Sequence, residues 1–208
     1  MKSDLTAQRA YLSLVADGAR EWKTLAAMAA DLRELKSRQK DHRATLMKAR
    51  PKVVATADNE WRLEVELGGK SHVFREHAFE QFARQIGFPP TLLPRCPENL
   101  ARENIGYFTF LGDRDVLWRA EGSEIRAVLS PEYVPVSHIE IVDRFNESGK
   151  KYDVNWAGVT EKRMFILAID SDKFNGPDGS RLSHCTLVGN SETGEGTFFG
   201  KDLLFDHI

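Results

Sequence analysis

The chain of 208 residues is 41% apolar and 29% charged and has a formal net charge of −2, which is an ordinary soluble balance. This length suits one domain with an appendage, or two small domains. No run of about 18 apolar residues occurs, which excludes a membrane-spanning helix, and the first residues lack the apolar stretch of a signal peptide. Cys96 and Cys185 are far apart, so neither a disulfide framework nor a thiolate zinc site is expected, and a reducing cytoplasm fits best.

Positive charge is concentrated near the N-terminus. Residues 1–50 carry 11 lysines and arginines against 6 acidic residues, whereas residues 51–208 carry 18 against 25. The basic residues between positions 33 and 52 are Arg33, Lys36, Arg38, Lys40, Arg43, Lys48, Arg50 and Lys52. Such a run is typical of a solvated helix face. It also fits a footprint for nucleic-acid phosphates or for the acidic surface of a partner.

Residues 4–48 are predicted to be helical. An apolar stripe recurs at steps of three and four, formed by Leu12, Val15, Ala19, Trp22, Ala26 and Ala29. A neighbouring face carries Leu25, Met28, Leu32 and Leu35. The stripe is expected to pack either on the body of the domain or on a second copy, which would make a homo-oligomer. Pro51 ends the helical pattern, so a basic helical leader over residues 1–50 is predicted before an α+β domain over 51–208.

The α+β domain opens with strands and two helices. Residues 53–57, 61–67 and 71–76 alternate apolar and polar side chains, and Gly68-Gly69 is predicted to be a tight hairpin turn. Residues 77–87 place Phe79, Phe82 and Ile86 on one helical face. A second helix is expected at about 97–108, after a proline-rich stretch.

The remaining residues are predicted to form strands around one further helix. Residues 115–130 read as a hairpin around Gly122, and Ser137 is expected to cap a helix that runs to about Phe145. Strands are expected at 151–160, 163–169 and 182–189, with residues 170–180 as a connecting loop. The fold class predicted from this order is α+β with a mainly antiparallel sheet and packed helices.

Metal and catalytic motifs find little support. DSDKFNGPDGS (170–180) has Phe174 and Asn175 where a calcium loop needs a ligand and a glycine. The six histidines do not cluster in ligand spacing. Ser130 lacks the G-x-S-x-G elbow of a hydrolase. We therefore expect no resident cofactor and regard an enzyme as less plausible than a binding protein.

Aromatic and basic residues occupy neighbouring predicted elements. They are Tyr107, Phe108, Phe110, Trp118, Arg119, Arg126 and Tyr133. Proteins that bind single-stranded nucleic acid combine rings that stack on bases with cations that follow the backbone. Rings also fill cores, which is the interpretation favoured for Phe108 and Phe110. The residues predicted to contact nucleic acid are Arg38, Lys40, Arg43, Trp118, Arg119, Arg126 and Tyr133.

The stretch GNSETGEGTF (189–198) allows two interpretations. Its glycines permit the positive φ of a hairpin or bulge, so a structural turn is favoured. Alternatively Glu192, with Asp170, could hold Mg²⁺ in an enzyme that acts on nucleic acid.

Three ordered segments resemble a phage and plasmid protein family known as domain of unknown function 932. They are AFEQFARQIGFPPTLLPRCPENLARENIGYF (78–108), RAVLSPEYVP (126–135) and GNSETGEG (189–196). The resemblance covers roughly residues 50–208. It implies a phage or mobile-element setting near replication and recombination functions, but no reaction.

Together these observations predict a cytoplasmic phage or plasmid protein that binds single-stranded nucleic acid without catalysis. The alternatives are a Mg²⁺-dependent nucleic-acid enzyme and a protein-binding factor that docks through the leader helix.

Overall fold

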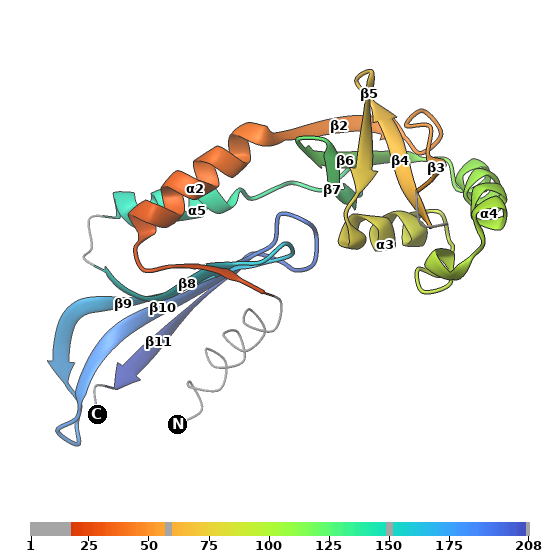
Figure 1. Cartoon of the computed structure of the whole chain (residues 1–208). Coiled ribbons are helices and arrows are strands. Elements are labelled where there is room, and N and C mark those ends of the chain that lie inside the picture. The colour runs from red at the N-terminus through yellow and green to blue at the C-terminus, as the bar shows by residue number, and fades with distance from the viewer. Residues whose placement is uncertain (1–17, 57–59, 149–151, 207–208) are drawn as a thin grey trace. The chain divides into compact units, whose positions relative to one another are not determined.

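The computed structural model describes residues 18–56, 60–148 and 152–206, although not the side chains of 153–155 and 205–206. The chain forms two compact units (Figure 1). Unit 1 comprises residues 1–36 and 135–208, and unit 2 comprises residues 37–134. Unit 2 is therefore a continuous stretch inserted between the two parts of unit 1. Each unit has a mostly antiparallel sheet with helices packed on it, which confirms the predicted α+β class.

Unit 1 is built on a five-stranded antiparallel sheet in the order β1-β8-β9-β10-β11. Its strands are β1 (Arg20–Trp22), β8 (Tyr152–Val159), β9 (Met164–Asn175), β10 (Arg181–Asn190) and β11 (Phe199–Asp206). Two helices, α2 (Leu25–Arg38) and α5 (His138–Glu147), lie along one face of this sheet (Figure 1). The strands β8, β9 and β10 confirm three of the predicted strands, and β11 was not predicted.

The core of unit 1 lies between these two helices and the sheet. Leu25, Met28 and Leu32 of α2 are buried there with Ile141 and Val142 of α5. Arg33 of α2 also donates to a carboxylate oxygen of Asp143 at 2.5 Å. The helix face that packs is the one with the larger side chains, because burying them removes more apolar surface from water.

The predicted leader helix is confirmed at α2 and is wrong on both sides of it. Its first residues, including Leu12 and Val15, lie outside the described residues. Residues 20–22 form β1, and residues 39–45 form a strand in unit 2. Within the described helix, Ala26 of the predicted stripe is exposed, whereas Ala29 of the stripe is buried together with Leu25, Met28 and Leu32 of the neighbouring face. The strand at 39–45 forms because pairing with β6 overrides local helix propensity.

Unit 2 contains a six-stranded sheet in the order β2-β6-β7-β5-β4-β3, antiparallel except for the β5–β7 pair. Its strands are β2 (Gln39–Thr45), β3 (Lys52–Ala55), β4 (Trp61–Leu67), β5 (Lys70–Phe74), β6 (Asp115–Glu121) and β7 (Glu124–Leu129). Its helices are α3 (Glu76–Gln85), the 3-10 turn η1 (Leu93–Arg95) and α4 (Glu98–Leu111). Both predicted helices and both predicted hairpins are confirmed, and Gly68, Gly69 and Gly122 have the positive φ that tight turns require.

The sheet of unit 2 curls around its own core. His42 of β2 lies beside His72 of β5, with ring centroids 6.2 Å apart, although the strands β6 and β7 lie between β2 and β5 in the sheet. The N–H of Glu66 donates to the carbonyl of Ala49 at 2.7 Å, which ties the turn after β2 to β4. The curled sheet encloses apolar side chains from α3, α4 and all six strands, among them Phe82 and Trp118.

The predicted loop at 170–180 is mostly strand, because β9 extends to Asn175 and pairs with β10 as far as Arg181. Among the described residues, no helix has both the length and the apolar character needed to cross a bilayer.

The β4–β5 hairpin carries a nearly buried carboxylate. Ser71 Oγ donates to Glu64 at 2.5 Å and Arg62 Nε donates to it at 2.9 Å. Although burial opposes ionisation, the hydrogen bond from Ser71 is the larger effect and, with Arg62, holds the pKa of Glu64 below its ordinary value.

We expect Ser71→Ala to raise the pKa of Glu64 toward its ordinary value, as measured by NMR titration of the carboxyl carbon. A depressed carboxyl pKa stabilises the fold above the unfolded-state pKa, and this stabilisation disappears as pH falls through the folded-state pKa. The variant should therefore be less stable than the wild type at neutral pH and approach it in acid. Ser123→Ala, an exposed serine change in the same unit, is the control. An unchanged Glu64 pKa in Ser71→Ala would contradict the assignment.

Candidate nucleic-acid interface

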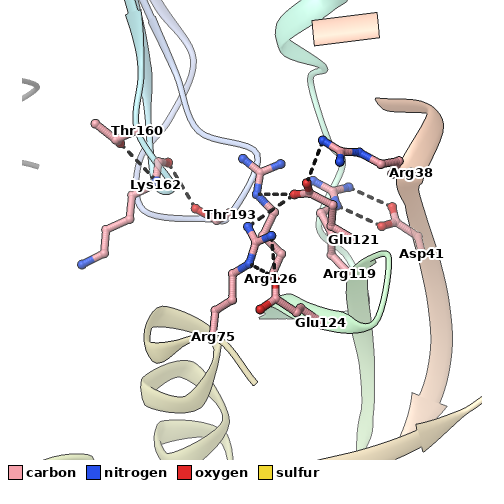
Figure 2. Close-up of polar contacts among 10 residues, drawn as sticks. All are labelled: Arg38, Asp41, Arg75, Arg119, Glu121, Glu124, Arg126, Thr160, Lys162 and Thr193. Carbon is pink, nitrogen blue, oxygen red and sulfur yellow. Dashed lines mark hydrogen bonds and ion pairs between the residues drawn. The ribbon is translucent and has the colours of Figure 1, made fainter. Parts of the chain in front are cut away.

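Three of the arginines predicted to bind phosphate gather in an ion-pair network around the β6–β7 hairpin (Figure 2). In the register of this hairpin, Arg119 pairs with Ala127 and Ala120 pairs with Ile125, so Arg126 is the extra residue of a β-bulge. A bulge changes the direction of a side chain relative to regular alternation. Here it brings Arg126 to the same side of the hairpin as Glu121.

Glu121 is the centre of this network. Its carboxylate lies 3.3 Å from Arg75, 3.6 Å from Arg38 and 3.9 Å from Arg126. Arg75, the residue that precedes α3, also contacts Glu124 at 2.8 Å. Residues from α2, β5–α3, β6 and β7 are thus held together by one hairpin carboxylate.

A second ion pair joins β2 to β6. Arg119 donates to both carboxylate oxygens of Asp41, at 2.9 and 2.8 Å, and the two residues are direct partners in the strand register. The Tyr133 ring lies 6.0 Å from the Arg119 guanidinium, and Arg43 donates to the carbonyl of Pro131 at 2.7 Å. The segment after β7 is therefore fastened to β2 and β6.

The burial of two arginines of the network contradicts their predicted role as phosphate contacts. Arg119 is 1% exposed and Arg126 is 5% exposed, so neither presents a free cationic surface to a nucleic-acid backbone. Arg38 and Arg43 are exposed but have the partners described above. The reason is electrostatic: a guanidinium that leaves water must gain a carboxylate or hydrogen-bond acceptors in return. Lys40, also predicted, is exposed on β2.

Of the two predicted stacking residues, Trp118 differs from expectation. Trp118 is fully buried among Phe74 and Phe82, and its indole N–H donates to the carbonyl of Ala44 at 3.2 Å. A base cannot reach this ring while the core is intact, which corrects its predicted role. Tyr133 is half-buried over Arg119.

In unit 1, the GNSETGEGTF stretch forms the end of β10 and the loop between β10 and β11, and its residues up to Thr193 are buried. Glu192 is 5% exposed and accepts hydrogen bonds from the His138 N–H at 2.6 Å and from Ser137 Oγ at 3.3 Å. Its carboxylate therefore lies at the first turn of α5, where backbone N–H groups lack helical partners and negative charge is favoured. Asn190 adds a hydrogen bond to the Val136 carbonyl at 2.7 Å.

The same loop is anchored to the β8–β9 turn. Ser191 and Thr193 donate to the carbonyl of Lys162 at 2.7 and 3.1 Å, and the Lys162 N–H donates to Thr160 at 3.1 Å (Figure 2 draws the threonine contacts). The hydroxyls thus satisfy backbone groups. This arrangement supports the structural interpretation of the GNSETGEGTF stretch.

The predicted pairing of Glu192 with Asp170 at one Mg²⁺ ion is wrong. Met164 pairs with Asn190 at one end of the β9–β10 ladder, and Ile169 pairs with Cys185 farther along it. Asp170 is therefore six residues, or about 20 Å of strand, from the end at which Glu192 lies. Across the part of the chain that the structure describes, no three histidine, cysteine, aspartate or glutamate side chains form a metal-binding group.

An aromatic surface lies on α4, at rings that were not among the residues predicted to contact nucleic acid. Tyr107 is 60% exposed and Phe110 is 65% exposed, and Leu100 and Leu111 are exposed on the same side of the helix. Phe108 instead packs against Phe88, with ring centroids 5.2 Å apart. The core prediction thus holds for Phe108 and is wrong for Phe110. The 3.6-residue period of the helix distinguishes the packed Phe108 from the exposed Phe110, because Ala101, Ile105 and Thr109 mark the buried side of α4.

The turn after β2 is hydrogen-bonded to the residues that follow α4. The Leu46 N–H donates to the Arg114 carbonyl at 3.0 Å, and the Met47 N–H donates to Asp113 at 2.9 Å. These two bonds hold the turn after β2, with the exposed Lys48, beside the residues that follow α4. The exposed Lys48 therefore lies on a turn that is held close to the C-terminal end of α4.

No family model, curated protein or solved structure matches the chain. The family resemblance stays a prediction from its three motifs.

We expect Asp41→Ala to lower the free energy of unfolding by about 2 kcal/mol, because it leaves the buried Arg119 guanidinium without its carboxylate. The double variant Asp41→Ala with Arg119→Met should lose less, since it removes the stranded charge as well. Urea denaturation followed by tryptophan fluorescence measures both. Glu80→Ala removes the exposed partner of Arg84 and should change little. If Asp41→Ala and Glu80→Ala lower the free energy of unfolding equally, the Asp41–Arg119 ion pair contributes no more to stability than an exposed ion pair.

Removing the Glu192 carboxylate from the N-terminal end of α5 should also destabilise the fold. Glu192→Ala is expected to lower the free energy of unfolding by about 1–2 kcal/mol, as for the loss of a helix cap. Glu192→Gln should lose less, because an amide oxygen can still accept the His138 N–H. Thermal unfolding by circular dichroism, with the exposed Glu21→Ala of the same unit as control, provides the comparison. If Glu192→Ala melts like the wild type, the carboxylate does not cap the helix.

Proposed function

We propose that this protein binds single-stranded nucleic acid as a non-catalytic module, in the cytoplasm of a bacterial host and in a phage or mobile-element setting. The observation that carries the proposal is the pair of rings on α4, Tyr107 at 60% and Phe110 at 65% exposure. This location replaces Trp118 and Arg119, which lie inside unit 2.

The exposed rings have the chemistry that unpaired bases require. Each aromatic face that stacks on a base contributes about 1–3 kcal/mol, with little dependence on sequence. Keeping two large rings in water is unfavourable in the free protein, so a ligand that covers them gains from their burial. A duplex hides its base faces and would gain much less.

Cations beside the rings supply the second requirement. Lys48 is exposed on the turn that hydrogen bonds fasten to residues 113–114, next to the C-terminal end of α4. Lysine binds phosphate as a point charge. Bases stacked on Tyr107 and Phe110 would place their backbone near this side chain.

A second candidate function uses the same surface. Leu92, Leu100 and Leu111 are exposed together with the rings, and Glu103 is exposed on the same helix. Aliphatic side chains and a carboxylate favour a protein partner over a phosphate backbone. In this alternative the protein is a protein-binding factor that docks through α4 and not through its leader.

Fluorescence anisotropy tests the proposal with labelled single-stranded DNA, single-stranded RNA and duplex DNA of about 20 nucleotides each. We expect the single strands to bind more tightly than the duplex. Tyr107→Ala with Phe110→Ala should weaken single-strand binding at least about tenfold, in keeping with the loss of two stacking faces. Lys48→Ala should reduce the salt dependence of log K by about 0.7.

The control variant is Lys173→Ala with Phe174→Ala, which removes an exposed lysine and a partly exposed ring from the β9–β10 hairpin of unit 1. It should leave nucleic-acid affinity unchanged. Absence of single-strand binding by the wild type, or equal losses in the α4 and control variants, would reject the proposal. The α4 surface would then be assigned to a protein partner.

A further inference from the structure

Unit 1 contains an open cavity of about 440 Å³ between α5 and the sheet. Its floor is formed by Thr186 and Val188 of β10, and its walls by Ile141 and Phe145 of α5, Tyr152 of β8 and Phe198 before β11. The volume falls within the range of small-molecule sites, about 300–1,000 Å³. All of these residues belong to unit 1, so the cavity is independent of the surface on α4.

The cavity stays open because the face of the sheet beside α5 has little side-chain volume at two paired positions, one on β10 and one on β11. Val188 pairs with Gly200 on β11, and Thr186 is the next residue on the same face of β10. A Cβ atom added at Gly200 would meet nothing within 4 Å. The backbone of Gly200 has no positive φ, so backbone conformation does not require glycine here. The missing side chain leaves space next to the floor.

The cavity walls favour an aromatic ligand. Phe145 and Tyr152 meet edge to face, with centroids 5.4 Å apart and planes at 73°, and so present ring surface on one side. Phe198 is 52% exposed on the other side. Flat aromatic molecules gain edge and face contacts with such rings in addition to burying apolar area.

The mouth of the cavity adds a cation. Arg144 lines it from the last turn of α5, and its side chain is 86% exposed. Its ion pair with Glu147 is long, 4.0 Å, and exposed pairs of this kind contribute little. Guanidinium groups bind carboxylates and phosphates through two parallel hydrogen bonds. Glu140, one turn earlier on α5, lines the same mouth and favours a ligand that also carries a hydrogen-bond donor.

We propose that this cavity binds a small aromatic molecule with a carboxylate or phosphate group. The ring packs between Phe145, Tyr152 and Phe198 over Val188, and the anion meets Arg144. The proposal does not depend on nucleic-acid binding by unit 2.

Two fluorescent probes with the same aromatic body test the proposal on the full chain. 1-Anilinonaphthalene-8-sulfonate carries an anion, and N-phenyl-1-naphthylamine lacks it. Both should bind saturably. Gly200→Val, which fills the space beside the floor, should weaken both at least about tenfold. Arg144→Gln should weaken only the sulfonate, by about two- to fivefold, because it leaves the ring contacts intact.

Control variants and competitors complete the experiment. Lys201→Val adds the same side chain at the next residue of β11, on the opposite face, and should change neither affinity. Phe198→Ala removes a ring that is already half exposed, so it provides a second cavity variant should Gly200→Val fail to fold. Tyr107→Ala with Phe110→Ala should leave the probe affinities unchanged, which excludes binding at α4.

Competition by indole-3-acetate or by adenosine monophosphate distinguishes a carboxylate ligand from a phosphate ligand, and displacement by either supports the site. The proposal is overturned if neither probe binds saturably, if the folded cavity variants bind both probes like the wild type, or if neither competitor displaces the sulfonate.

Discussion

Charged side chains that leave water must gain an opposite charge or hydrogen bonds, and this requirement organises both units. In unit 2, burial of Arg119 is compatible with folding because Asp41 offers two oxygens from the adjacent strand. In unit 1, Glu192 is held by the N-terminal end of α5. Each contact joins segments that are distant in sequence, 78 and 54 residues apart. The charges therefore help to specify which segments meet, while apolar burial supplies most of the driving force.

Local structure can be predicted from the sequence where a residue type or pattern is typical of a single backbone conformation. Gly68, Gly69 and Gly122 mark turns because other residues avoid positive φ, and the alternation of residues 61–67 indicates a strand whatever its partner. The leader was harder to predict. Residues 39–45 contain good helix formers, and their pairing with β6 depends on a strand some 75 residues later in the chain. No local pattern carries that information.

The candidate site was predicted less well, for a related reason. An arginine on a strand next to a tryptophan has the same sequence signature whether it faces a ligand or a carboxylate. Only the β-bulge at Arg126 and the register that opposes Arg119 to Asp41 decide between them. By contrast, the exposure of Phe110 follows from helical phase, since Ala101 and Ile105 already mark the buried side of α4. That signal was present in the sequence and needed only consistent use of the 3.6-residue period.

The insertion of unit 2 into unit 1 has a consequence for biosynthesis. A chain that leaves the ribosome from its N-terminus can complete unit 2 once residue 134 has emerged, because that unit is continuous. The apolar side of α2, with Leu25, Met28 and Leu32, is buried in a cluster with residues of α5, β8, β9 and β10, which are synthesised more than 100 residues later. Translation therefore imposes an order, with the inserted unit complete before the surrounding one. During that interval the apolar side of α2 lacks the residues that bury it in the complete fold.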